Sequence, residues 1–193
     1  MSRDLSTIPP DSNGITQFKK LIMTRKLAGS LEGGPLRIGI AVSRFNENIT
    51  QPLLEGALAE LKSLGVADSN VTMAQVPGAV ELPLALSQMA ASKNYDALVA
   101  LGCVIRGGTP HFDYVCRITS DGCCQVSLEY GIPVGFGVLT CDTLAQAQER
   151  SDINALQSAA GAKESGGATN KGMEAARTAV EMANLAKKLR EQK

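Results

Sequence analysis

Short apolar segments alternate with segments of helical periodicity from residue 36 onwards, and this alternation constrains the fold more than any other feature of the chain. The apolar segments 37–42, 71–76, 97–104 and 133–139 are typical of buried strands. Strands that alternate with helices form βαβ units, whose right-handed crossovers build a parallel sheet covered by helices on both faces. We therefore predict an α/β fold, a three-layer α/β/α sandwich with a central four-stranded parallel sheet.

The helices are predicted at 49–64, at 112–130, at 144–150, at 171–190 and between Pro77-Gly78 and residue 91. In the first helix, we expect Thr50 to cap the N-terminus, Pro52 to lie in the first turn and Gly65 to end the helix. The segment 97–104 is apolar almost without interruption, which indicates a strand with both faces covered.

Residues 1–35 differ from the rest because prolines and glycines punctuate them. We interpret them as a partly flexible N-terminal extension, with a short basic helix at 15–27, ahead of one domain at 36–193. The extension is either a mobile tail or an arm that packs on a neighbouring subunit. An organellar transit peptide is an open alternative, although Asp4, Asp11 and Glu32 fit poorly with one. Residues 151–170, rich in Ala, Gly and Ser, are predicted to be an inserted loop within the domain.

The composition disfavours several classes of protein. Basic and acidic residues number 19 each without a long basic run, which argues against nucleic acid as the main partner. The longest apolar run, 97–105, is much shorter than the ~20 residues of a membrane helix, and no secretory signal is visible. Five cysteines without a C-x-x-C motif, and a single histidine, suggest neither a metal site nor disulfides. We expect free thiols in a reducing cytoplasm.

Ligands of such sheets bind outside the carboxyl ends of the strands, which selects the turns 43–48, 77–81 and 106–113 and the segment 140–150. His111 lies in the third turn, and imidazole transfers protons near neutral pH. Gly107, Gly108 and Thr109 precede it, at a helix start that favours anions. A structural histidine and a plain tight turn are the alternatives.

Further candidates lie in the other segments. Phe45 follows a strand, where an aromatic ring can stack on a flat heterocycle. Arg150 can bind a phosphate, or it is a solvated surface residue. Glu81 is a candidate ligand-binding carboxylate or a simple helix cap. Phe136 lies within a strand and by pattern belongs to the core.

Five blocks of sequence together resemble the 6,7-dimethyl-8-ribityllumazine synthase family, and the resemblance spans residues 36–189 except 151–170. The blocks are RIGIAVSRFNENIT at 37–50, VPGAVELP at 76–83, YDALVALGCVIRGGTPHFDYV at 95–115, IPVGFGVLTCDTLAQAQER at 132–150 and NKGMEAARTAVEMAN at 170–184.

The resemblance implies a flavodoxin-like fold and a transferase of riboflavin biosynthesis. Such enzymes condense 5-amino-6-(D-ribitylamino)uracil with 3,4-dihydroxy-2-butanone 4-phosphate, and they require neither metal nor cofactor. The product is 6,7-dimethyl-8-ribityllumazine, with release of phosphate and water. The family's sites lie between subunits of a ring, so a homopentamer is implied, with riboflavin synthase as a candidate partner. Because 151–170 replaces a turn that helps pack pentamers into shells, we expect a free pentamer.

The resemblance also assigns roles to individual positions. His111 becomes the proton shuttle. At the pyrimidine, substrate-binding roles fall to Phe45, Asn46, Val104, Ile105 and Lys171, and Cys103 beside them is also assigned to substrate binding. Ala79, Val80 and Glu81 are assigned to the ribityl chain, and Gly108, Thr109 and Arg150 to the phosphate. Phe136 is assigned to the site of a neighbouring subunit, which Arg150 also reaches.

Two other hypotheses compete with the active synthase. One is a catalytically inactive flavin- or lumazine-binding homologue, which would keep Phe45 and could dispense with His111 or Arg150. The other is a nucleotide-binding regulator, although neither a P-loop nor a G-x-G-x-x-G motif is visible.

Overall fold

The computed structural model describes residues 25–154 and 169–192 and shows four strands and five α-helices in those ranges. The strands are β1 (Ile38–Ser43), β2 (Val71–Val76), β3 (Ala97–Ile105) and β4 (Val134–Cys141). The helices are α2 (Glu47–Ser63), α3 (Leu82–Ala91), α4 (His111–Tyr130), α5 (Leu144–Arg150) and α7 (Lys171–Arg190), with single 3-10 turns at Asp68–Asn70 and Ala79–Glu81. The predicted alternation of strands and helices is therefore confirmed.

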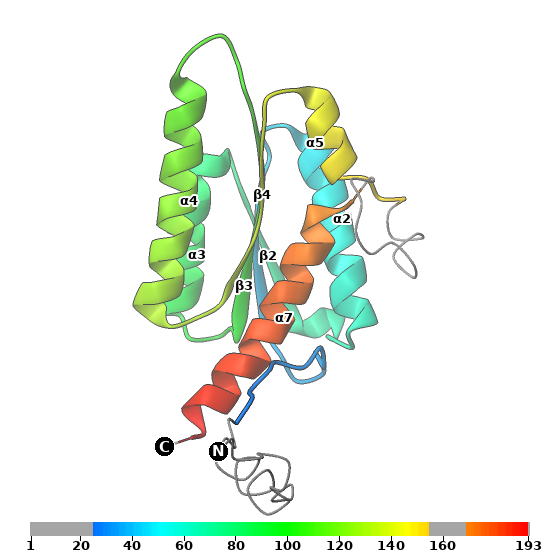
Figure 1. Cartoon of the computed structure of the whole chain (residues 1–193), viewed down its shortest axis with the longest axis vertical. Helices are drawn as coiled ribbons and strands as arrows, with labels where there is room; N and C mark the ends of the chain where they lie inside the picture. The colour runs from blue at the N-terminus through cyan, green and yellow to red at the C-terminus, as the bar shows by residue number, and fades with distance from the viewer. Residues whose placement is uncertain (1–24, 155–168, 193) are drawn as a thin grey trace, which may run out of the picture.

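All strands of the sheet are parallel, in the order β2-β1-β3-β4. Helices α3 and α4 cover one face, and α2, α5 and α7 cover the other (Figure 1). This is the expected three-layer α/β/α sandwich with a flavodoxin-like topology. The carboxyl ends of the strands meet at one edge of the sheet, where α2, α4 and α5 follow their strands (Figure 1).

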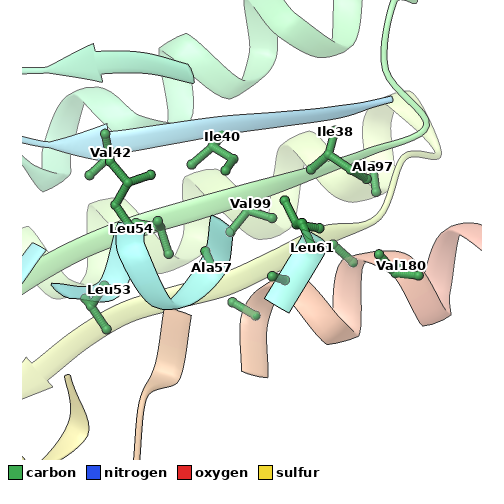
Figure 2. Packing of buried hydrophobic residues seen from close by; sticks show 14 of the residues in the cluster. Ile38, Ile40, Val42, Leu53, Leu54, Ala57, Leu61, Ala97, Val99 and Val180 are labelled. Atoms are coloured by element: carbon green, nitrogen blue, oxygen red, sulfur yellow. The ribbon is translucent and has the colours of Figure 1, made fainter. Parts of the chain in front are cut away.

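The core consists of two apolar layers, one on each face of the sheet. Every residue of β1 is buried, and so is every residue of β3 except the last. Figure 2 shows Ile40 and Val99 of these central strands facing Leu54 and Leu61 of α2, with Val180 of α7 beside them. Burial of both faces explains why β3 is apolar almost throughout.

The start of α2 differs from the prediction. Asn46 is the residue before the helix and adopts a left-handed conformation, with φ of 59°. Thr50 lies inside the helix, and its hydroxyl donates to the carbonyl of Ser43 at 2.7 Å. Pro52 lies beyond the first turn. The predictions for Thr50 and Pro52 were wrong because the helix begins earlier than its apolar pattern. Gly65 follows the end of the helix with φ of 86°, as predicted.

The described part of the N-terminal extension packs on its own chain. The Nδ2 of Asn184 in α7 donates to the carbonyls of Ser30 and Glu32, and Lys188 donates to that of Ala28. Residues 25–27 are not helical, and the rest of the predicted helix at 15–27 lies outside the described residues.

Most of the predicted inserted loop, residues 155–168, also lies outside the described residues. Its two ends are joined by an antiparallel bridge between Ser151 and Asn170. Within the described ranges, none of the helices is long and apolar enough to cross a membrane.

Candidate active site

A cavity of about 360 Å³ opens at the carboxyl ends of β1 and β3. The connection after β1 leads to β2 on one side of β1, and the connection after β2 leads to β3 on the other side of β1. The direction in which strands are added to the sheet therefore reverses at this point. Ligands of open α/β sheets bind at such a reversal. The cavity is lined by Phe45, Gly78, Ala79, Val80, Glu81, Cys103, Val104, Ile105, Gly107, Thr109, His111, Phe112 and Val115.

Phe45 lies on the turn between β1 and α2, and its side chain is 69% exposed at the cavity. Its backbone is held in place because Phe45 N–H donates to the carbonyl of Pro77 at 3.0 Å. An aromatic ring exposed to this degree on a fixed backbone offers a flat surface for a heterocycle. The neighbouring Asn46 donates from Nδ2 to the carbonyl of Cys103 at 2.9 Å, which joins this turn to β3.

The wall opposite the end of β3 is formed by the segment between β2 and α3. Ala79 is buried there, whereas Val80 and Glu81 are exposed. One carboxylate oxygen of Glu81 accepts a hydrogen bond from Gly78 N–H at 2.9 Å. That bond fixes the side chain and leaves the second oxygen available to a hydroxyl group of a ligand.

The end of β3 supplies Cys103, Val104 and Ile105 to the cavity. Burial, with a smaller contribution from Cys141, raises the pKa of the Cys103 thiol to about 12. Cys103 is therefore a neutral side chain near pH 7, and it contributes shape to the cavity instead of a nucleophile. All five cysteines are free thiols.

His111 is the first residue of α4 and lies at the opening of the cavity. In the described part of the chain, its imidazole has no hydrogen-bond partner, so both nitrogens are available to a substrate. No side chain caps the start of α4. A Cβ atom at Gly107 or Gly108 would meet nothing within 4 Å, so open space borders this backbone. These features suit an anion beside a proton-transferring group.

Nine of the predicted site residues therefore line a single cavity: Phe45, Ala79, Val80, Glu81, Cys103, Val104, Ile105, Thr109 and His111. Asn46 and Gly108 are adjacent to lining residues in the chain. The structure places three others outside the cavity. Lys171, at the start of α7, binds both carboxylate oxygens of Glu174, at 2.8 and 2.7 Å.

Arg150 ends α5, where its guanidinium donates to the carbonyl of Gln146 at 3.1 Å. Phe136 is 45% exposed, so its interpretation as a core residue was wrong. The reason is that β4 is an edge strand, whose outer margin α4 covers only in part. Both side chains are exposed and directed to surfaces outside this cavity.

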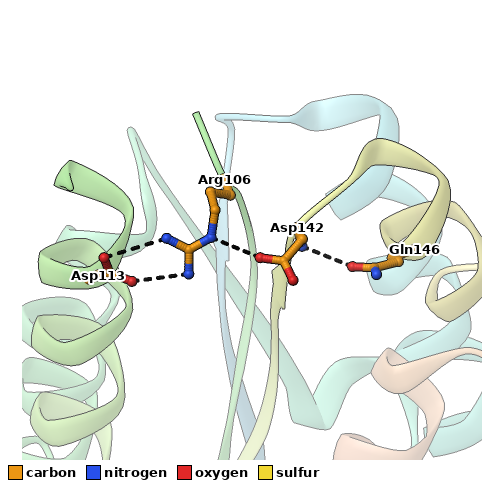
Figure 3. A network of polar contacts seen from close by, with 4 residues as sticks. All are labelled: Arg106, Asp113, Asp142 and Gln146. Atoms are coloured by element: carbon orange, nitrogen blue, oxygen red, sulfur yellow. Dashed lines mark hydrogen bonds and ion pairs between the residues drawn. The ribbon is translucent and has the colours of Figure 1, made fainter. Parts of the chain in front are cut away.

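Gly107, a candidate for the anion-binding turn, also lines the cavity, whereas sequence reasoning missed three lining residues, Gly78, Phe112 and Val115. Val115 lies four residues after His111 in α4, so helical spacing from His111 could have indicated it, whereas Phe112 adjoins His111 and no spacing rule indicates it. Sequence reasoning also missed Arg106, which joins Asp113 and Asp142 beside the cavity (Figure 3). No local pattern indicates this set, because Arg106 and Asp142 are 36 positions apart.

The fold and the cavity together point to a class of protein, an α/β enzyme whose site lies at the carboxyl ends of its parallel strands. Within the described ranges, no cluster of three His, Cys, Asp or Glu side chains is placed to hold a metal ion.

Comparison with known proteins identifies the family. The family model described as 6,7-dimethyl-8-ribityllumazine synthase matches residues 35–187. A relative of that name from Desulfatibacillum aliphaticivorans is 50% identical over 168 residues, which cover 87% of this chain and all of the relative. The chain belongs to the 6,7-dimethyl-8-ribityllumazine synthase family, and the resemblance seen in the sequence is confirmed.

Proposed function

We propose that the chain condenses 5-amino-6-(D-ribitylamino)uracil with 3,4-dihydroxy-2-butanone 4-phosphate to give 6,7-dimethyl-8-ribityllumazine, phosphate and water. The observation that carries this proposal is the cavity in which an exposed Phe45, a fixed Glu81 and an unpaired His111 meet. Membership of the family supports the same reaction.

Each substrate has a matching part of the site. The pyrimidine ring stacks on Phe45, beside the backbone at the end of β3, which offers hydrogen bonds to its polar edge. The ribityl chain lies along Ala79, Val80 and Glu81, and Glu81 accepts from its hydroxyl groups. The phosphate of the butanone lies at Gly108 and Thr109, near the uncapped start of α4.

The chemistry needs proton transfers more than a protein nucleophile. The amine of the pyrimidine attacks the ketone carbon, and loss of water gives an imine. Elimination of phosphate then leaves an enol, and ring closure with loss of water completes the lumazine. His111 moves protons to and from these groups at the opening of the cavity. The protein also aligns the two substrates, which lowers the entropic cost of their reaction.

We further propose that the complete site forms between two copies of the chain in a homopentamer. None of the described residues that line the cavity is Lys or Arg, so one copy offers no basic side chain to the phosphate. Arg150 and Phe136 are exposed outside the cavity of their own chain, as residues that serve a neighbour would be. Lys171, which the resemblance assigns to the pyrimidine, also lies outside the cavity of its own chain, where it pairs with Glu174.

The pentamer is proposed to remain free, to act in the cytoplasm and to have riboflavin synthase as a partner. Five free thiols are consistent with a reducing compartment. Light scattering on the purified protein tests the assembly, for which we expect the mass of five chains. A particle of megadalton size would instead indicate a closed shell.

The test of the reaction is to mix the purified protein with both substrates and follow lumazine formation against the uncatalysed rate. We expect a saturable rate proportional to protein concentration. No acceleration, with the ribityl pyrimidine still bound, would favour the inactive binding homologue instead.

A further inference from the structure

Burial of side chains does little to hold the turn that carries His111 in place. Residues 106–111 are all exposed, and the first half of α4 buries few side chains. Two glycines, Gly107 and Gly108, add backbone freedom, and no side chain caps the helix. A proton-transferring side chain must nevertheless be held within a fraction of an ångström of its working position. Another contact must therefore fix the turn.

Arg106 makes the contacts that the turn otherwise lacks. Its Nη2 and Nη1 donate to the two carboxylate oxygens of Asp113 at 3.1 and 3.4 Å, and its Nε donates to Asp142 at 2.8 Å. Its guanidinium also lies 4.1 Å from the centre of the Phe112 ring. Arg106 N–H donates to the carbonyl of Cys141, so the base of the side chain is tied to β4 as well.

Figure 3 shows Arg106 between Asp113 of α4 and Asp142, which follows β4, with Gln146 of α5 beyond Asp142. Asp113 belongs to the first turn of α4, and Phe112 is itself a lining residue. Asp142 follows β4, and its N–H donates to the side-chain oxygen of Gln146 in α5 at 2.8 Å. The planar guanidinium binds Asp113 through two donors and Asp142 through a third, and an ammonium group cannot reproduce this paired, planar contact.

We propose that Arg106 is a positioning residue for the condensation, because it holds the first turn of α4, and with it His111, against the end of β4. This inference rests on the proposed role of His111 as the proton shuttle. Exposed ion pairs add little stability. The effect of Arg106 is therefore expected on the rate of the reaction and not on the stability of the fold.

A direct role of Arg106 in binding the phosphate gives a different expectation. Removal of Asp142 increases the positive charge at Arg106, so phosphate binding would be unchanged or tighter in that case. If Arg106 instead positions the turn, loss of the Asp142 carboxylate removes the contact between Arg106 and the end of β4, and the reaction slows. The variant Asp142→Asn therefore separates the two roles.

The experiment compares Arg106→Gln, Asp142→Asn and the double variant, each as the full-length protein with both substrates. Arg117→Gln is the matched control, because Arg117 also pairs with an aspartate of α4, Asp121, away from the cavity. We expect each single variant to lower kcat about tenfold, below the roughly 100-fold that a displacement of 1 Å can cause. KM for the pyrimidine and the melting temperature should change little.

The double variant is expected to be no slower than Arg106→Gln alone, because both changes remove the same interaction between Arg106 and Asp142. Should Arg106→Gln fail to fold, Arg106→Lys takes its place, with an intermediate kcat expected from a single-point contact. Wild-type kcat in Asp142→Asn, or losses that multiply in the double variant, would overturn the proposal. Failure of the proposed function would look different, since the wild-type protein itself would then be inactive.

Discussion

Asn170 joins the start of α7 to α2 and to Ser151, the first residue of the inserted loop. Its Oδ1 accepts from Gly172 N–H at 3.0 Å and from Met173 N–H at 3.2 Å, which caps α7. Its Nδ2 donates to the carbonyls of Pro52 at 3.0 Å and Ser151 at 3.3 Å. The side chain is 2% exposed, so water cannot replace these bonds.

We predict that Asn170→Ala destabilises the protein by about 2–4 kcal/mol. Loss of an N-cap contributes about 1 kcal/mol. The buried carbonyl of Ser151 loses its donor, which costs roughly 1–3 kcal/mol. For a protein of this size, the sum corresponds to a fall in melting temperature of about 5–15 °C. Asn170→Ser, which keeps the cap and loses the amide donors, should cost only the donor contribution of roughly 1–3 kcal/mol.

Gly56 provides an independent test of the same packing. A Cβ atom at this position of α2 would lie 2.7 Å from Nδ2 of Asn170, inside normal contact. Gly56→Ala alone should therefore destabilise by about 1–3 kcal/mol through overpacking. In the Asn170→Ala background the obstruction is gone, and the better helix propensity of Ala should make the same change neutral or stabilising by up to about 1 kcal/mol.

Urea unfolding followed by circular dichroism measures the four proteins of this cycle at one fixed protomer concentration, because assembly also contributes to stability. The reasoning predicts a coupling energy of about 2 kcal/mol between the two positions. It would be refuted if Gly56→Ala cost the same in both backgrounds, or if Asn170→Ala and Asn170→Ser were equally stable.

Three further predictions concern the site and the thiols. His111→Ala should lower kcat on the order of 10²–10⁴ in the lumazine assay, and a near-normal rate would assign His111 a structural role. Arg150→Ala should raise KM for the butanone phosphate far more than KM for the pyrimidine, and equal increases would contradict a phosphate role. Burial raises the pKa of Cys103 and Cys123 to about 12, so the reactive thiolate gains population only as the pH rises toward that value. At pH 8 only about one thiol in ten thousand is ionised, and iodoacetamide should label both residues in mass spectra after unfolding but not before. Rapid labelling of the native protein would show that they are accessible.

The sequence predicted most of the elements because secondary structure depends on local spacing. The ranges for β2, α5 and α7 agree with the prediction, and the other elements differ at their ends by a few residues. Helix α2 shows the limit of this reasoning: Asn46 starts it in a left-handed conformation, which no apolar pattern indicates. The turns 43–48, 77–81 and 106–113, which supply much of the cavity, followed from one rule, that parallel strands bring their carboxyl ends to the same edge of the sheet. Cys103, Val104 and Ile105 were indicated by the family resemblance instead.

The contacts that depend on strand order and helix packing could not be predicted from local patterns. Phe136 has the sequence context of a core residue, and it is exposed because β4 is an edge strand. Arg106 contacts Asp142 because β4 lies beside β3, and Asn170 reaches Pro52, 118 positions away, because α7 packs on α2. The spacing of apolar residues indicates which face of a helix or strand is buried, but it does not indicate which other segment covers that face. Which segments become neighbours is decided by how the buried faces of the whole chain fit together.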